Sequence, residues 1–97
     1  MIELFSKVRS PSYQCIDFVI DAWFEITGIK LDRLQPCFGL SLISEIKSPC
    51  VVVFKNKDRL HKHIGIHIDG KIMHLAASVQ YVDMDFVIGY SDVEYLA

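Results

Sequence analysis

The feature that most constrains the fold of this chain is a strict two-residue alternation around an Asp-Gly pair. Residues 63–75 read HIGIHIDGKIMHL, in which isoleucine holds every second position from 64 to 68 and histidine or glycine stands between. This period is typical of a half-buried strand, and Asp69-Gly70 is a strong signal for a two-residue type I′ turn. The segment predicts a β-hairpin with isoleucines on its core face and histidines on the other face.

Counting outward from the turn gives the register of this hairpin. Gly65 lies opposite His74, and His63 lies opposite Ala76. His63 and His74 are then diagonal neighbours on one face, about 7 Å or less apart at Cβ, and Gly65 is expected to leave open space above His74. A polar partner that holds an imidazole and fixes its tautomer is what a general base needs. The hairpin therefore predicts a histidine pair suited to proton transfer.

A helical segment, SPSYQCIDFVIDAWFEITGIKL at 10–31, precedes the hairpin. Ser10, Pro11 and Ser12 each suit a helix start, and Gly28 holds the position favoured just past a helix end. Apolar residues recur between them at steps of three and four, which predicts one buried stripe: Cys15, Val19, Ala22, Trp23 and Ile26. Phe18 and Phe24 are also expected to pack in the core.

The cysteine of this helix is the candidate nucleophile. Cys15 falls in the first turn, where the free N–H groups and the positive end of the helix dipole favour thiolate over thiol. A neighbouring histidine would stabilise that thiolate as an ion pair. If the helix lies against the histidine face, Cys15 and His63 form a set suited to acyl transfer through a thioester.

The remaining segments predict one more helix and further strands. FGLSLISEIK at 38–47 keeps a three-residue apolar step, which favours a short helix that ends at Ser48-Pro49. Four later segments read as a buried strand, a polar loop and two short strands: CVVVF at 50–54, KNKDRLHK at 55–62, QYVDM at 80–84 and DFVIGY at 85–90. This order predicts an α+β domain in which an antiparallel meander packs on the first helix.

Composition narrows the class of protein. The chain has 97 residues, of which 52% are hydrophobic and 23% charged, so we expect one domain over residues 1–97. A net charge of -2 gives no basic field for nucleic acid. The start resembles no secretory signal, and no apolar stretch approaches the ~20 residues of a membrane span. We expect a protein made in the cytoplasm that reaches other sites only through a carrier such as a phage particle or a secretion machine.

The cysteine and histidine spacings do not predict a disulfide framework or a metal site. Three cysteines at wide spacing leave at least one thiol unpaired, and Cys37 and Cys50 are expected to be small buried residues. His61, His63 and His67 share one parity, His74 joins their face across the hairpin turn, and imidazoles suit zinc or nickel. No carboxylate or CxxC pair has ligand spacing, however, so we expect no metal and no cofactor, with His61 and His67 at the surface or rim.

Two stretches carry a resemblance to a known family: YQCIDFVIDAW at 13–23 and SPCVVVFKNKDRLHKHIGIHIDGKIMHLA at 48–76. They resemble the NlpC-type peptidases, papain-like cysteine hydrolases of bacterial cell walls that also occur in phage tails. The family pattern runs from a helix-start cysteine through a strand shaped like GDLVFF to a strand beginning HVGIY and a partner ending IHA. Here Cys15, VVVF, HIGIH and MHLA hold those places in the same order.

The resemblance implies a papain-like fold and a role for each matching residue. Cys15 would be the nucleophile, His63 the general base and His74 the residue that orients it. Backbone N–H groups around Cys15 would form the oxyanion hole, with Tyr13 near that hole and Gly65 beside the substrate. The implied reaction is hydrolysis of an amide bond, often between D-glutamate and a diamino acid of a peptidoglycan stem peptide, by a phage tail component or an injected effector.

Other readings remain open beside this one. The chain has Ile16-Asp17 where the family commonly has Ser-Gly, Pro49-Cys50 where it has Gly-Asp, and His67 where it has tyrosine. These departures are expected to change substrate preference, which leaves room for an amidase or acyltransferase acting elsewhere in the cell. A structural module of a phage tail or another large particle, without useful turnover, is the alternative. Its features are the bulky Ile16 and the apolar tail at 86–97.

Overall fold

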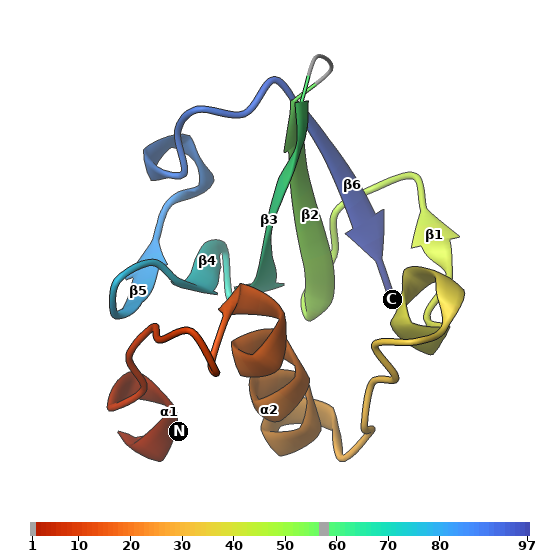
Figure 1. The fold of residues 1–97 in the computed structure, drawn as a ribbon. Coiled ribbons are helices and arrows are strands. Elements are labelled where there is room, and N and C mark those ends of the chain that lie inside the picture. The colour runs from red at the N-terminus through yellow and green to blue at the C-terminus, as the bar shows by residue number, and fades with distance from the viewer. Residues whose placement is uncertain (1, 57–58) are drawn as a thin grey trace.

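The fold consists of an antiparallel sheet with its main helix on one face (Figure 1). The computed structural model describes the backbone of residues 2–56 and 59–97, and side chains within residues 3–56 and 62–97. Within these ranges the elements are α1 (Ile2–Phe5), α2 (Cys15–Thr27), η1 (Pro36–Gly39), β1 (Leu42–Ile43), β2 (Cys50–Asn56), β3 (Arg59–Ile68), β4 (Lys71–Leu75), β5 (Val79–Val82), η2 (Met84–Phe86) and β6 (Asp92–Leu96). No helix of the described part is long and apolar enough to cross a bilayer.

The sheet has the strand order β1-β6-β2-β3-β4-β5, and every neighbouring pair is antiparallel. Strands β2 to β5 form the expected meander. Strand β6 then returns across the sheet to pair with the free edge of β2, and β1 pairs with β6. The predicted α+β class with an antiparallel meander is therefore confirmed, with two further strands added by long-range pairing.

The hairpin of β3 and β4 has the register that the sequence predicts. Gly65 pairs with His74 and Ile68 with Lys71. Asp69 and Gly70 have φ angles of 52° and 85°, the left-handed values that both central residues of a type I′ turn adopt. The turn residues thus fix which side chains share a face along both strands.

Strand β3 begins earlier than expected. Lys55 pairs with Lys62 and Asn56 with Arg59, so most of the predicted polar loop at 55–62 belongs to strands, and residues 57–58 lie outside the described part. The loop prediction was wrong there because ladder hydrogen bonds join backbone groups and do not require apolar side chains.

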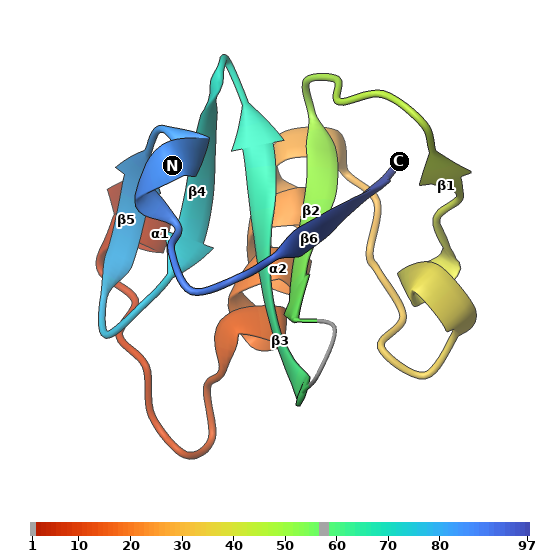
Figure 2. The same ribbon diagram turned by 90° about the horizontal axis from the view of Figure 1, so that it is seen from above.

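Both faces of the sheet are covered (Figure 2). Alternate residues of β2, β3 and β4 pack against α2 in one cluster, which includes Val51, Ile64, Ile66 and Met73. The intervening residues belong to a second cluster, in which Val52, Phe54 and Ile72 contact the 84–90 segment and β6. The helix therefore packs on the isoleucine face, the predicted core face, and the condition that it lies against the histidine face is not met.

Helix α2 begins later than the start signals suggested. Ser10 and Tyr13 exchange backbone hydrogen bonds of 3.0 and 3.1 Å, and this tight turn uses Ser10, Pro11 and Ser12 before the helix starts. Gln14 is the N-cap, and Cys15 is the first helical residue. Gly28 ends the helix in a left-handed conformation and donates to the Phe24 carbonyl at 2.8 Å. The delayed start places Cys15 at the tip of the helix.

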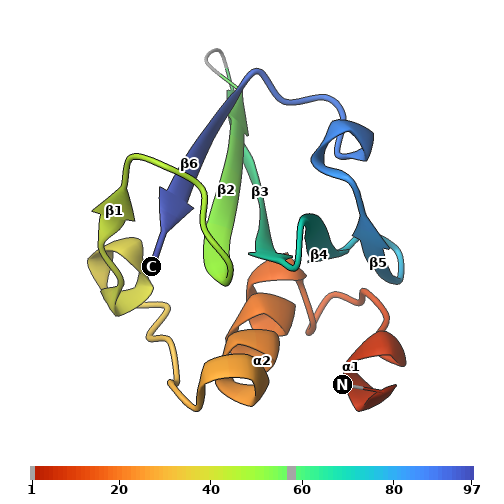
Figure 3. The same cartoon turned by 180° about the vertical axis from the view of Figure 1, so that it is seen from behind.

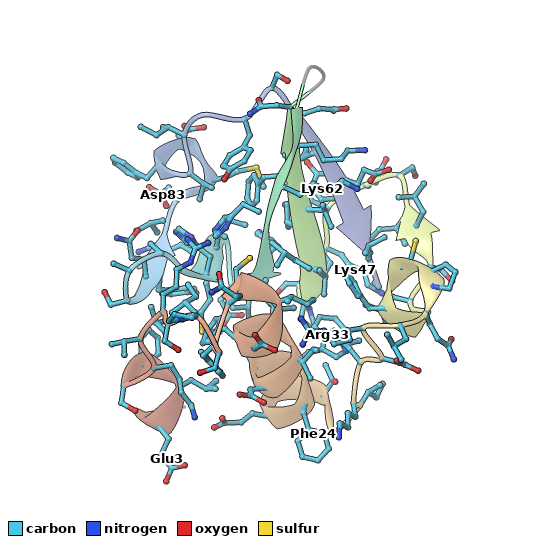
Figure 4. The ribbon with its side chains drawn as sticks, viewed as in Figure 1. Glu3, Phe24, Arg33, Lys47, Lys62 and Asp83 are labelled. Carbon is cyan, nitrogen blue, oxygen red and sulfur yellow. The ribbon has the colours of Figure 1, made fainter. Side chains whose placement is uncertain are left out.

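The buried stripe of α2 is close to the predicted one. Phe18, Val19, Ala22 and Trp23 are buried, whereas the Phe24 side chain is 54% exposed and points away from the sheet (Figure 4). Phe24 was therefore wrongly expected in the core. Helix α1 lies beside α2 (Figure 3), and its Leu4 joins the same core cluster.

Two other predicted elements were wrong. Residues 38–47 form the end of η1 and strand β1 instead of a helix. Leu42 and Ile43 are held by pairing with β6, a contact that local periodicity cannot reveal. Residues 85–90 are not a strand: η2 and the loop after it place apolar side chains such as Met84 and Val87 on the second cluster, and the last strand forms at Asp92–Leu96.

Candidate active site

The centre of the candidate site is a direct contact between the two histidines of the hairpin. His63 Nε2 and His74 Nδ1 are 2.8 Å apart, a hydrogen-bond distance. The side chains are only 8% and 5% exposed, and the rings meet edge to face with their centroids 5.0 Å apart. The predicted neighbours on one face of the hairpin therefore form a buried pair with one shared hydrogen bond.

Burial sets the protonation preference of the inner histidine. Loss of hydration lowers the pKa of His74, and Gln80 partly opposes that shift. Gln80 stands directly opposite His74 on β5. Because a charged His74 is disfavoured, its neutral imidazole is the form that meets His63 near neutral pH.

Aromatic rings hold His63 from the other side. The ring of Tyr90 lies nearly parallel to that of His63, at 16° and 6.0 Å between centroids, and Phe54 lies 6.1 Å away. The backbone beside Tyr90 is tied to β2, because the Ser91 N–H donates to the Lys55 carbonyl at 3.0 Å. Packing against these rings restricts the orientation of the His63 imidazole.

Cys15, at the tip of α2, shares a pocket with one member of this pair. Cys15 and His63 line one pocket of about 350 Å³, and Ile16, Arg33, Phe38, Val53, Lys62 and Ile64 complete its walls. A second pocket of about 270 Å³ lies on the other side of His63 and includes His74, Gln80 and Tyr90. His63 thus stands between the pocket of the thiol and the pocket of its partner histidine.

The pKa of Tyr90 supports the nearness of these groups. Burial raises the pKa of this phenol, a charge on Cys15 raises it further, and Arg9 opposes the shift. The thiol, the phenol and the imidazole therefore share one electrostatic environment. Tyr90 was not singled out in the sequence, where it stood within a predicted strand and no local pattern marked it.

The first turn of α2 presents backbone donors beside the thiol. The Gln14 N–H donates to Asp17 Oδ2 at 2.8 Å, which fixes the entry of the chain into the helix. The first N–H groups of a helix have no intrahelical acceptor, and here they belong to Cys15 and Ile16. They offer the polarised donors that an oxyanion hole needs.

Two cations, Arg33 and Lys62, border the pocket that Cys15 and His63 line. Asp17 Oδ1 accepts a hydrogen bond from Arg33 Nη1 at 2.9 Å, and this ion pair holds Arg33 at the wall of the Cys15 pocket. Lys62 adds a second cation from β3; both residues are labelled in Figure 4. Among the described residues that line this pocket, none carries a carboxylate.

Tyr13 is placed differently from the expectation. Its hydroxyl donates to Asp21 Oδ2 at 2.6 Å, more than one helical turn beyond Cys15, and the ammonium of Lys7 lies 5.5 Å from its ring centroid. The phenol is therefore directed along α2. This geometry gives no support to the oxyanion role that the resemblance implied for Tyr13.

Gly65 does not leave open space above His74. A Cβ at this position would lie 3.0 Å from Ile72 Cγ2 and 3.1 Å from both His74 Cβ and the Met73 carbonyl oxygen. The expectation that Gly65 leaves open space above His74 was therefore wrong. The glycine allows the two strands and His74 to pack closely, and provides no room for substrate.

His67 and Cys50 are cross-strand partners elsewhere in the sheet. His67 Nδ1 donates to the Lys47 carbonyl at 2.8 Å, and the side chain of His61 lies outside the described residues. Cys50 is buried as expected, whereas Cys37 is exposed, which corrects the expectation of burial. Among the side chains that the structure describes, no three His, Cys, Asp or Glu residues converge on a point where a metal ion could bind.

Comparisons with family models, with curated proteins and with solved structures found no match to this chain.

Proposed function

We propose that this protein is a cysteine hydrolase with a papain-like arrangement of helix and sheet, which cleaves an amide bond through a thioester. The observation that carries the proposal is the buried His63–His74 pair, whose His63 borders the same pocket as a cysteine at the tip of a helix. A nucleophile, a base and a group that orients the base are the three parts of such a site.

The hydrogen bond between His63 Nε2 and His74 Nδ1 supports a role for the other ring nitrogen of His63. In the proposed mechanism His63 Nδ1 exchanges a proton with Cys15 Sγ. The thiolate attacks the carbonyl carbon of the amide, and the Nδ1 proton passes to the leaving nitrogen as the C–N bond breaks. Water then attacks the thioester, gives its proton to Nδ1, and the carbon–sulfur bond breaks to restore Cys15.

The walls of the pocket indicate the kind of acyl group that fits. Ile16, Phe38 and Val53 supply apolar surface, and Arg33 and Lys62 supply positive charge. A peptide amide of a peptidoglycan stem, as the resemblance implies, is the proposed substrate class. The proposed setting is a phage tail component or an effector delivered to the wall.

The first test measures cysteine chemistry and needs no substrate. We expect iodoacetamide to alkylate Cys15 rapidly at pH 5 to 6, where ordinary thiols are slow, and His63→Ala to abolish that advantage. Exposed Cys37 and buried Cys50 serve as internal references, and His67→Ala on the same strand is the matched control. Peptide mass spectrometry from pH 5 to 9 reports each rate. An unreactive Cys15, or a rate that ignores His63, would remove the mechanism.

A second test measures turnover. Peptidoglycan fragments incubated with the wild-type protein should yield new amino termini, and Cys15→Ser should yield none while its unfolding curve stays close to wild type. If both proteins are inactive on a broad panel of amides although Cys15 is activated, the proposed substrate class is wrong and the proposed nucleophile stands.

One observation favours a structural module as the second candidate. Leu34, Phe86 and Ile88 are 90%, 70% and 79% exposed, and large exposed apolar side chains are typical of surfaces that bind other proteins. This reading predicts that Cys15 reacts as an ordinary thiol and that substitution of these three residues by serine leaves the monomer folded.

A further inference from the structure

The inner histidine of the pair has a buried nitrogen that lacks a partner. His74 uses Nδ1 for His63, while its Nε2 is buried and has no hydrogen bond of standard geometry to the described residues. The nearby Gln80 side chain nevertheless raises the pKa of His74. Buried polar atoms are almost always hydrogen-bonded in folded proteins. The Nε2 atom therefore marks a position where one more group is needed.

The proposed chemistry fixes which proton this atom carries. For Nδ1 of His63 to accept a proton from Cys15, His63 must hold its own hydrogen on Nε2 and donate it to His74 Nδ1. After His63 becomes an imidazolium, its Nε2 hydrogen is still donated to His74 Nδ1. His74 Nδ1 must therefore stay an acceptor throughout, which places the hydrogen of neutral His74 on Nε2. This N–H needs an acceptor.

Gln80 is the side chain in position to accept it. Gln80 is the cross-strand partner of His74 on β5, so both side chains project from the same face of the sheet. Both also line the smaller pocket with His63. Of the other polar side chains there, Arg9 offers only donors, and Tyr90 stacks on His63.

We propose that Gln80 is a positioning residue, whose side-chain carbonyl accepts the His74 Nε2 hydrogen and thereby selects the tautomer in which His63 holds its hydrogen on Nε2 and uses Nδ1 as the base. The inference rests on the proposed function for its catalytic meaning. The tautomer of His74 can nevertheless be measured without any reaction. The strand register sets the exposed Gln80 directly opposite His74, which is the placement that this bond requires.

The test compares three proteins by long-range ¹H–¹⁵N NMR of the histidine rings at pH 7.5. Wild type and Gln80→Glu, which keeps an acceptor, are expected to show His74 with its hydrogen on Nε2. Gln80→Leu removes the acceptor at similar size, and we expect the Nδ1–H form of His74 to appear. Gln35→Leu, a glutamine substitution elsewhere in the chain, is the control and should match wild type.

Cys15 alkylation gives the second readout. In Gln80→Leu the rate at pH 6 should fall about tenfold, the scale on which loss of an outer hydrogen bond to a functional histidine is felt, and Gln80→Glu should restore it. An unchanged His74 tautomer in Gln80→Leu overturns the inference, whatever the alkylation shows. Loss of the His63 dependence of alkylation in wild type instead overturns the proposed function, so the two failures are distinguishable.

Discussion

At the scale of single residues, the most consequential group is a histidine that is kept neutral. His74 is 5% exposed and bonded through Nδ1 to His63, so a charge on it would sit in a poorly hydrated place. Burial lowers its pKa for that reason. A neutral His74 can accept a hydrogen bond from His63, and a charged one cannot, because both of its nitrogens would be donors.

This shift predicts how stability depends on pH. The folded pKa of His74 lies below the unfolded value of about 6.5, so between the two values the unfolded chain binds the extra proton. The free energy of unfolding should fall as pH drops below about 6.5 and stop falling below the folded pKa. Urea unfolding at pH 7.5 and 5.5 checks this. His74→Asn should lose less stability over that interval than wild type, and an equal loss would contradict the shift.

Gly65 gives a second prediction at this scale. Because an added Cβ would meet three atoms at 3.0 to 3.1 Å, Gly65→Ala should destabilise the protein by about 1–3 kcal/mol, the range for overpacking a core. The urea midpoint measures this, and the position of His74 should be disturbed in the same variant. Unchanged stability would mean that Ile72 and His74 move aside at little cost.

At the scale of elements, the start of α2 places the thiol. The Ser10–Tyr13 turn and the Gln14 N-cap delay the helix until Cys15, so the sulfur sits on the first helical residue, beside unpaired N–H groups. Asp17 connects this start to the pocket wall, since one oxygen caps the helix and the other binds Arg33. One carboxylate therefore fixes both the helix start and a cation beside the thiol.

Removing the Asp17 carboxylate should affect both the start of α2 and the position of Arg33. Asp17→Ala is expected to cost about 1 kcal/mol of stability, as loss of a helix cap does, and to slow Cys15 alkylation by freeing Arg33. Arg33→Ala keeps the cap and removes only the ion pair, whose Arg33 and Asp17 side chains are 53% and 23% exposed, so it should cost less than Asp17→Ala, within about 1 kcal/mol. Urea unfolding of both variants separates cap from ion pair; equal costs would show that the cap contributes nothing.

At the scale of the whole molecule, the candidate site combines groups that come from both faces of the sheet. Helix α2 reaches it from one face and Tyr90, in the segment before β6, from the other. Residues distant in sequence thus surround His63. The cations of the thiol pocket, Arg33 and Lys62, come from the connection after α2 and from β3.

The positive wall of this pocket predicts selectivity between charged and neutral reagents. Iodoacetate and iodoacetamide differ mainly in charge, so the ratio of their rates at Cys15 reports the local potential. Two unit charges about 8 Å apart interact by about 0.5 kcal/mol in water. Lys62→Glu changes the charge by two, and should lower the ratio roughly fivefold. Lys30→Glu makes the same change outside this pocket; an equal effect there would mean that only net charge matters.

The sequence by itself determined the features that arise from local geometry. The alternation of β3 and the Asp69-Gly70 turn set the register, and the register alone brought His63 and His74 together. The apolar stripe of α2 was readable for the same reason, because a helix repeats every 3.6 residues.

Only the tertiary structure decided what depends on contacts between distant segments. These contacts include the pairing of β1 with β6, the face on which α2 packs, the ring of Tyr90 over His63, the close packing at Gly65 and the place of Gln80 opposite His74. Such contacts leave no period in the sequence, because each is set by how whole elements pack and not by the spacing of residues within one of them.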